Sequence, residues 1–226
     1  MASISYASQE ISVKIVYYGP GLSGKTTNLQ VIYKNVIPDF KSKLVSIATE
    51  NERTLFFDFL PLDLGNIKGF KIKLQLYTVP GQVYYNATRK LVLRGVDGLV
   101  FVADSGCDKI EDNIASLNNL EENLTMYKYK IENIPMVIQY NKRDLPNALS
   151  IEEMHQYINR YNHPWIEAVA STGAGVFDTL KLIGKNVIDD INKRYILAYK
   201  KRSNPISNAP VQQYQQYQSP QLRGSA

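Results

Sequence analysis

The chain has 226 residues, 44% of them hydrophobic, and a formal net charge of +5 at pH 7. That length suits one α/β domain with a well-formed core plus an appendage. The single cysteine, Cys107, excludes an internal disulfide and indicates a reducing compartment. No apolar stretch reaches the roughly 18 residues that a membrane span needs, and no lipidation motif is present. We therefore expect a cytoplasmic protein without a membrane anchor.

The positive charge is concentrated near the C-terminus. Five basic residues fall within residues 193–202 and one more is Arg223, so the remainder of the chain is close to neutral. Basic residues at the C-terminal end of a helix interact favourably with the helix dipole. They do not form the extended basic patch that nucleic-acid binding requires. We expect no nucleic-acid partner.

In the first half of the chain, an apolar run at residues 13–18 predicts a strand and residues 26–33 predict a helix. Two more strands are expected at residues 54–59 and 70–77. They are joined through residues 65–69, which contain two glycines and predict a hairpin turn. The later strand alternates polar and apolar residues, as a half-buried strand does.

In the second half, an unbroken apolar run predicts a central strand buried on both faces. Strands and helices then alternate, which is typical of βαβ units on a mostly parallel sheet. A capping box begins one helix at Ser150. The expected strands are residues 98–104, 136–140 and 165–169, and the expected helices are residues 110–127, one from Ser150, and one spanning 176–191. The prediction is an α/β fold with a six-stranded, mostly parallel sheet and five helices on its two faces.

From Ser203 the chain becomes rich in glutamine, proline and serine and poor in aliphatic residues. Such a segment cannot bury enough apolar surface to offset its chain entropy. We predict a folded domain over residues 1–202 and a disordered Gln/Pro-rich tail over residues 203–226. An inert tail and a tail that offers tyrosines to a partner both remain open.

The segment from Gly19 to Thr26 fits the phosphate-loop template GxxxxGK[ST] at every fixed position. A predicted strand precedes it and a predicted helix follows, as the template requires. In that template, backbone N–H groups surround the phosphates, Lys25 neutralises β- and γ-phosphate oxygens, and the Thr26 hydroxyl ligates Mg²⁺. A chance glycine-rich turn is the alternative. The predicted contacts are Gly19, Pro20, Gly21, Leu22, Ser23, Gly24, Lys25, Thr26 and Thr27.

The segment Asn141-Lys142-Arg143-Asp144 directly follows the apolar run at residues 136–140 and matches the guanine signature NKxD. The Asp144 carboxylate can accept hydrogen bonds from both N1–H and the 2-amino group of guanine. Adenine offers neither, so it would leave that carboxylate unpaired. Asn141 is expected at the N7 edge and the Lys142 stem over the purine face. A solvated turn is the alternative, but the position after a phosphate loop and at a strand end favours guanine recognition.

The order of phosphate loop, hairpin, Pro-Gly-Gln, Asn-Lys-x-Asp and closing loop resembles the Ras-like small GTPases over about residues 10–200. Residues 16–21, 53–61 and 77–82 are similar to the bacterial MglA-type members of that family. The resemblance implies a Ras-like P-loop GTPase domain that uses GTP, GDP and Mg²⁺. It also implies that the protein controls cell polarity and motility machinery by binding polarity or motility effectors. It further implies recruitment to a cell pole and a Roadblock-fold GTPase-activating partner of the MglB type. The chain by itself is expected to be monomeric.

For hydrolysis, the resemblance makes Gln82 the residue that orients water and Arg53 an intrinsic arginine finger. Gly81 is expected to meet the γ-phosphate through its N–H, and Thr54 to complete the Mg²⁺ ligands with Thr26. The alternative for Arg53 is a solvated arginine on a polar loop. A nucleotide-locked scaffold with little or no turnover is the alternative for the whole protein.

Two positions depart from the family pattern. Thr78 stands where an aspartate usually holds a Mg²⁺-bound water, so a hydroxyl replaces a charge there. Asp58, on the preceding predicted strand, is a candidate substitute. In the closing loop, Val169, Ala170 and Ser171 stand where the family has Ser-Ala-Lys. The serine and the lysine of that pattern are both absent, so we expect only a backbone contact from Ala170 to guanine O6.

Overall fold

The computed structural model describes residues 3–5, 7–49, 52–67 and 69–203. The chain divides into two compact units, residues 1–191 and residues 192–226, and the last helix runs across the boundary. The predicted boundary at residue 203 stays a prediction, because residues 204–226 lie outside the described part. Apart from the end of that helix, all the elements discussed below belong to the first unit.

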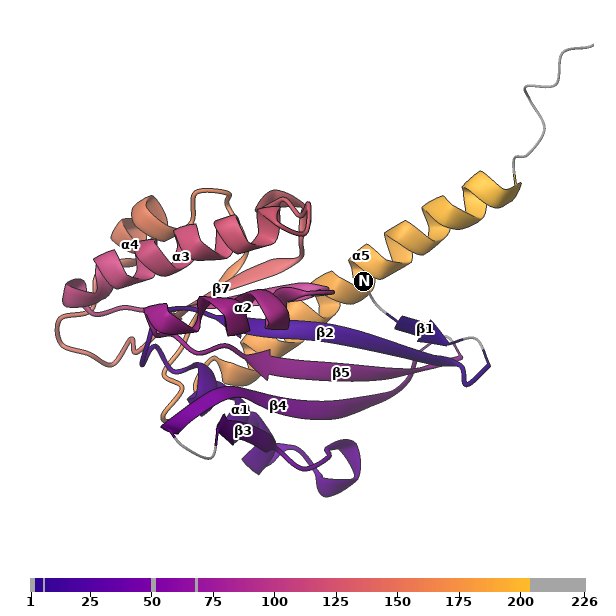
Figure 1. Cartoon of the computed structure of the whole chain (residues 1–226), viewed down its shortest axis with the longest axis horizontal. Helices are drawn as coiled ribbons and strands as arrows, with labels where there is room; N and C mark the ends of the chain where they lie inside the picture. The colour runs from indigo at the N-terminus through magenta and orange to yellow at the C-terminus, as the bar shows by residue number, and fades with distance from the viewer. Residues whose placement is uncertain (1–2, 6, 50–51, 68, 204–226) are drawn as a thin grey trace, which may run out of the picture. The chain divides into compact units, whose positions relative to one another are not determined.

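The described strands form one sheet of eight, with neighbours in the order β3-β4-β5-β2-β6-β7-β8 and β1 paired to β2. The pairs among β5, β2, β6, β7 and β8 are parallel, whereas β1–β2, β3–β4 and β4–β5 are antiparallel. The sheet is shown in Figure 1. Its strands are β1 (Ser3–Ser5), β2 (Glu10–Tyr18), β3 (Val45–Thr49), β4 (Glu52–Ile67), β5 (Phe70–Thr78), β6 (Gly98–Asp104), β7 (Met136–Asn141) and β8 (Trp165–Glu167).

The α/β architecture with a mostly parallel sheet that the sequence predicts is confirmed, and the sheet has two strands more than the six expected. β1 is three residues long with a single apolar side chain, so it carries no hydrophobic pattern. β3 is five residues long, and its register with β4 shifts after Ile47 and again after Ala48. Short strands stabilised by an existing neighbour give little periodic signal in the sequence.

Helices cover both faces of the sheet. The α-helices are α1 (Lys25–Asn35), α2 (Asn86–Leu93), α3 (Ile110–Thr125), α4 (Ile151–Ile158) and α5 (Val176–Ser203), and the short 3₁₀ turns are η1 (Pro38–Phe40), η2 (Val83–Tyr85), η3 (Cys107–Lys109) and η4 (Ile131–Asn133). The Ser150 hydroxyl accepts from the Glu153 N–H at 3.2 Å, which confirms the predicted capping box at the start of α4. Within the described residues, no helix is both long and apolar enough to cross a bilayer.

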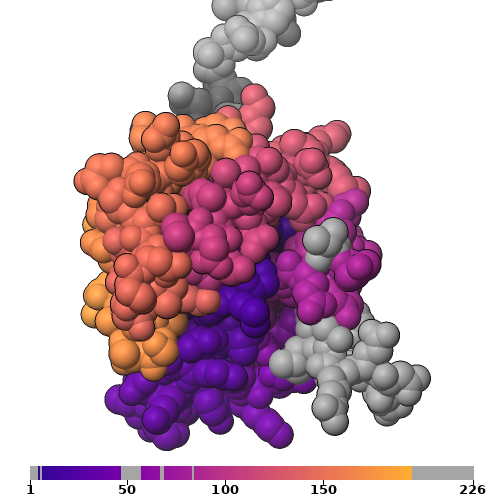
Figure 2. Space-filling model, turned by 90° about the vertical axis from the view of Figure 1, so that its left-hand side faces the viewer, coloured from indigo at the N-terminus to yellow at the C-terminus, as the bar shows by residue number. Residues whose placement is uncertain are grey.

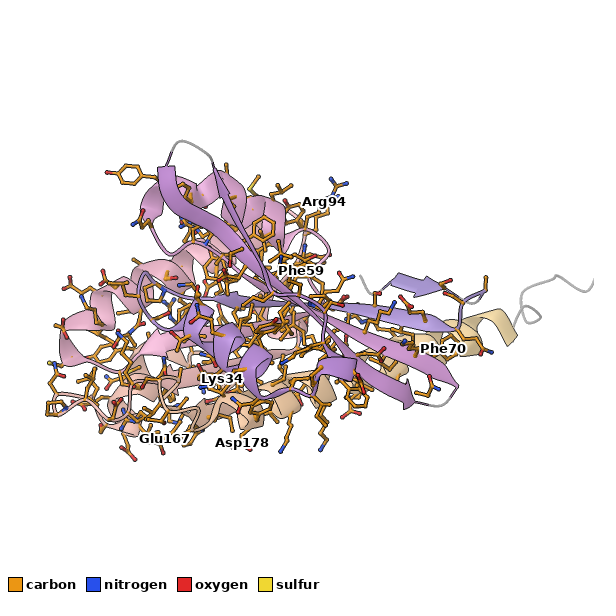
Figure 3. All side chains as sticks on the ribbon, turned by 90° about the horizontal axis from the view of Figure 1, so that it is seen from below. Lys34, Phe59, Phe70, Arg94, Glu167 and Asp178 are labelled. Atoms are coloured by element: carbon orange, nitrogen blue, oxygen red, sulfur yellow. The ribbon has the colours of Figure 1, made fainter. Side chains whose placement is uncertain are left out.

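Two apolar cores form because side chains alternate between the faces of the central strands. On β2, Val16 and Tyr18 join α2, α3 and α4, whereas Val13, Ile15 and Tyr17 join α1 and the first part of α5. Figure 3 shows side chains packed between the strands and the helices and labels Phe59 on β4. The rings of Phe59 and Tyr77 have a centroid distance of 4.7 Å. The carboxyl ends of β2, β6 and β7 therefore meet at one edge of a rigid sheet, where ligands bind in open α/β folds.

Candidate nucleotide-binding site

The loop between β2 and α1 has the backbone that a phosphate loop needs. Gly24 has a φ of 103° and directly precedes α1, and a Cβ added there would lie 2.2 Å from Asn141 Nδ2. A Cβ on Gly19, whose φ is 142°, would lie 2.3 Å from the Val102 carbonyl oxygen. Glycine is required at both positions, because a side chain would be strained and would also push against β6 or against the end of β7.

Lys25 begins α1 and is buried beneath this loop. Its Nζ donates to the carbonyl oxygens of Gly19 at 3.0 Å and Pro20 at 2.5 Å. Burial, together with the nearby Arg89 guanidinium, lowers the pKa of Lys25 to about 7. This amine belongs to the first residue of α1, so it lies close to the N-terminus of that helix. Both features favour an anion there. Figure 2 shows an indigo part of the N-terminal region at the surface, between the magenta and the orange parts of the chain.

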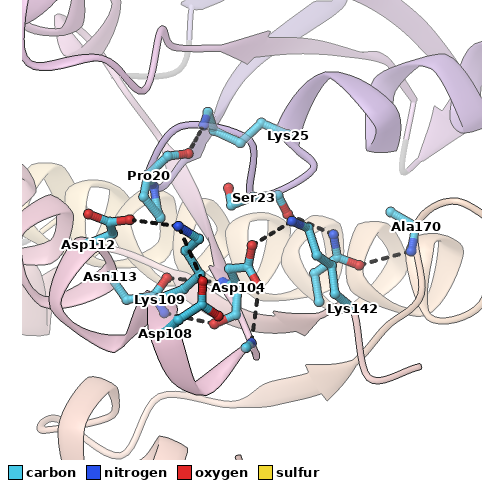
Figure 4. Close-up of polar contacts among 12 residues, drawn as sticks. Pro20, Ser23, Lys25, Asp104, Asp108, Lys109, Asp112, Asn113, Lys142 and Ala170 are labelled. Carbon is cyan, nitrogen blue, oxygen red and sulfur yellow. Dashed lines mark hydrogen bonds and ion pairs between the residues drawn. The ribbon is translucent and has the colours of Figure 1, made fainter. Parts of the chain in front are cut away.

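The carboxyl end of β7 is bonded directly to the phosphate loop. Asn141 Nδ2 donates to the Ser23 carbonyl at 2.7 Å, and Asn141 Oδ1 accepts from the Ala170 N–H at 2.9 Å (Figure 4). One buried amide thus joins the end of β7 to two loops that are far from it in the sequence. Asp144 and Ser171 are exposed beside them. The predicted contact of Ala170 with guanine O6 stays a prediction, and here the same N–H is engaged by Asn141.

A buried carboxylate lies where the sequence departs from the family pattern. Asp58 on β4 is 2% exposed, and its Oδ2 accepts from the hydroxyls of Thr26 at 2.7 Å and Thr78 at 2.9 Å. Its Oδ1 accepts from the Ser46 hydroxyl at 2.8 Å. The Asp58 N–H in turn donates to Thr78 Oγ1 at 2.8 Å, so the two strands hold both side chains in place.

A cavity of about 280 Å³ opens at these groups, lined among others by Lys25, Thr26, Asp58, Thr78 and Gly81. Mg²⁺ prefers a few hard oxygen ligands and keeps several waters when it binds phosphates. The hydroxyl of Thr26 and the carboxylate of Asp58 are donors of that kind, so the residues present fit a magnesium ion.

The Pro80–Gln82 loop lies against the phosphate loop. A Cβ added to Gly81 would lie 2.3 Å from the backbone nitrogen of Gly21, so the two glycine backbones are in contact. Gln82 is exposed. Arg89 on α2 donates from Nη1 to the carbonyl oxygens of Pro80 at 3.2 Å and Gln82 at 2.5 Å, which fixes the path of the loop.

The other two predicted residues, Arg53 and Thr54, lie on β4, which the structure places as a strand beside β3 and β5. Their side chains fall outside the described part of the structure. Their proposed roles therefore rest on the sequence.

Comparison with known proteins shows where this site belongs. The Ras family model matches residues 14–189. The chain is 59% identical over 193 residues to the mutual gliding-motility protein MglA of Myxococcus xanthus, an alignment that covers 85% of this chain and 99% of that protein. It is also 25% identical over 194 residues to the human ADP-ribosylation factor-like protein 4C, covering 85% of this chain and 90% of the relative. The chain belongs to the Ras family.

As a Ras-family small GTPase, the protein binds guanine nucleotides and hydrolyses GTP, and it acts as a switch between the two nucleotide states. The alternative of a nucleotide-locked scaffold is not favoured. Proteins of this type are regulated by partners.

Sequence reasoning on this Ras-family chain did not identify two buried polar groups beside the site, Asp104 and Arg89. Asp104 ends a uniformly apolar strand, and a charged residue in that position is a signal that could have been used. Arg89 lies in a short helix of mixed composition, and nothing in its sequence context distinguishes it from a surface arginine.

Proposed function

We propose that this chain is a magnesium-dependent GTP switch that controls cell polarity and motility machinery through partners that recognise its nucleotide state. The biological role rests on the 59% identity to a protein whose name describes gliding motility. Recruitment to a cell pole and a Roadblock-fold activating partner of the MglB type belong to the same proposal.

The observation that carries the nucleotide site is the bridge made by Asn141 to Ser23 and Ala170. It brings the phosphate loop to the segment that bears Asp144, so one ligand can reach both. In the proposed complex, the Asp144 carboxylate accepts from guanine N1–H and the 2-amino group, and the Lys142 stem covers the purine. Backbone N–H groups from Gly21 to Thr27, with the Lys25 ammonium, hold the phosphates.

For the metal, we assign ligation to the hydroxyls of Thr26 and Thr54, with Asp58 and Thr78 orienting the shell. Asp58 Oδ2 accepts a hydrogen bond from the Thr26 hydroxyl, with 2.7 Å between the two oxygens. This bond directs the hydrogen of Thr26 toward Asp58 and leaves the lone pairs of the Thr26 oxygen free to face a cation. Magnesium bound with the phosphates offsets negative charge that develops during phosphoryl transfer.

For hydrolysis, the Gln82 side chain orients the attacking water and the Arg53 guanidinium compensates charge on the leaving phosphates. Because Arg53 belongs to the chain itself, an activating partner can act without donating a catalytic residue. It needs only to reposition β4 and the Pro80–Gln82 loop.

The test uses Arg53→Ala and Gln82→Ala in the full chain with GTP and Mg²⁺. Each variant should bind GTP nearly as the unchanged protein does, yet hydrolyse it about a hundredfold or more slowly, even with a Roadblock-type partner. Single-turnover hydrolysis and equilibrium binding separate the two effects. Arg160→Ala is a matched control, because that exposed arginine bonds Asn118 at 2.7 Å, outside the loops assigned to the site. Unimpaired partner-stimulated turnover in either variant would remove that residue from the catalytic set.

A further inference from the structure

Asp104 is a buried carboxylate at the base-binding end of the sheet. It is the last residue of β6, it is 2% exposed, and its neighbour on β7 in the strand register is Asn141. Figure 4 shows it between the phosphate loop and the segment after β7. A charge this far from water persists only where partners compensate for its lost hydration.

The protein holds this carboxylate in one orientation. Asn113 on α3 accepts from the Asp104 N–H at 3.0 Å and donates to the Asp104 carbonyl at 2.8 Å. The Gly106 N–H donates to Oδ1 at 3.1 Å. The backbone and one carboxylate oxygen are therefore engaged, and Oδ2 points toward the segment after β7.

Oδ2 meets the ammonium of Lys142 at 2.5 Å. The Lys142 side chain is 34% exposed, so without a partner it could extend into water. Its backbone φ of 65° is a left-handed conformation that L residues seldom adopt, and it sets the direction in which the side chain leaves the chain. Backbone and ion pair thus act together on a side chain that would otherwise be mobile.

We propose that Asp104 is a positioning residue for guanine-nucleotide binding: it holds the Lys142 stem in place before the base arrives. This inference rests on the proposed role of Lys142 at the purine face. A flexible lysine must lose side-chain entropy on covering a base, and Asp104 makes that ordering a property of the free protein. The carboxylate itself does not touch the nucleotide.

Asp104→Asn tests the charge with little change in shape. The amide cannot satisfy both neighbours, because either orientation sets its NH₂ group against another donor, the Gly106 N–H or the Lys142 ammonium. We expect binding of GDP and of a non-hydrolysable GTP analogue to weaken equally, by about tenfold. The single-turnover rate of pre-bound GTP should stay unchanged, because the pair lies at the base and not at the phosphates.

A double-mutant cycle separates positioning from a merely structural role. Lys142→Met should weaken binding, and adding Asp104→Asn to it should weaken binding no further, because the group that Asp104 positions is already gone. A structural role for Asp104 would lower affinity equally in both backgrounds, and that result would overturn the proposal.

Lys142→Arg alters only the partly exposed partner and keeps its charge, so it should bind better than Lys142→Met. Equal loss in the two would also contradict the proposal, even if Asp104→Asn failed to fold.

Asp112→Asn is the matched control, because Asp112 forms an exposed pair with Lys109 at 3.6 Å on the same helix as Asn113. Its affinity should equal that of the unchanged protein. Calorimetry on the unchanged protein with GDP and ADP is run alongside. If that protein prefers GDP while Asp104→Asn binds GDP as tightly, only this inference fails. If it shows no preference for guanine, the proposed nucleotide site fails first.

Discussion

At the scale of single residues, Lys25 shows how the free protein is prepared for a phosphate. Its amine is out of water and bonded to two carbonyl oxygens of the loop that it supports. Burial lowers its pKa from 10.5 to about 7, because desolvation penalises the charged form. A bound phosphate supplies the missing negative charge and should restore the ammonium.

We therefore expect nucleotide binding to take up a proton at pH 8, and less at pH 6, where Lys25 is already charged. Calorimetry of GDP binding in buffers with different ionisation enthalpies measures the number of protons. The same shift makes the nucleotide-free fold more stable as the pH rises above about 7, because the unfolded chain, whose lysine pKa is 10.5, binds that proton more tightly. Equal proton uptake at the two pH values would contradict this assignment.

The glycines of the phosphate loop were predictable as residues, and the structure adds the reason for each. The template requires Gly19 and Gly24 but does not say which groups approach them. In the fold, the approaching groups are the Val102 carbonyl on β6 and the Asn141 amide at the end of β7. The two glycines of the template are thus required by contacts of the phosphate loop with β6 and β7, which are distant in the sequence and which no local pattern predicts.

At the scale of elements, β4 supplies a carboxylate that β5 lacks. Asp58 and Thr78 are 20 residues apart in the chain, yet the antiparallel pairing of β4 with β5 sets them side by side. A third side chain, Thr26 on α1, donates its hydroxyl hydrogen bond to the same carboxylate. A carboxylate from β4 thus lies beside the hydroxyls of Thr26 and Thr78. The family pattern has its own carboxylate at position 78, so Asp58 is the candidate to replace it.

Asp58→Ala should weaken magnesium-dependent nucleotide binding by about tenfold or more, since loss of a group that orients a metal ligand typically has that effect. Binding measured in a chelator should change little. Nucleotide release followed across a magnesium titration separates the two conditions. Asp63→Ala is the control, because Asp63 lies on the same strand in a partly exposed pair with Lys71 at 2.7 Å. An unchanged magnesium dependence in Asp58→Ala would exclude the role.

Much of the element order follows from the sequence, because apolar strands and amphipathic helices alternate along this chain. Contacts between elements do not follow in the same way. Asn28 on α1 and Gln139 on β7 exchange buried amide hydrogen bonds of 2.8 and 2.9 Å, and Gln139 also donates to Thr179 on α5. Each polar residue alone resembles an interruption of an apolar pattern. Only the packing of α1 and α5 against β7 shows that these polar groups satisfy one another. Their hydrogen bonds join the helix that follows the phosphate loop to the strand that precedes Lys142.

At the scale of the whole first unit, two apolar cores on opposite faces share one sheet, and the site lies where central strands of that sheet end. The phosphate loop follows β2, and the segment 141–144 that is expected to bind guanine stands at the end of β7. In the strand order, β6 lies between β2 and β7. A nucleotide that contacts both loops must therefore bind the folded sheet and not the unfolded chain. Such a ligand raises stability by mass action.

GDP with Mg²⁺ at a hundred times its dissociation constant should stabilise the protein by about 2.7 kcal/mol. For a protein of this size, that raises the thermal unfolding midpoint by roughly 5 to 10 °C. ADP at the same concentration should give almost no rise, because adenine leaves the Asp144 carboxylate unpaired.

Asp144→Asn should unfold near the same temperature as the unchanged protein without ligand, since Asp144 is exposed. Its GDP-induced rise should shrink, because a neutral amide cannot accept both guanine donors. A rise with ADP equal to that with GDP would show that position 144 does not select the base.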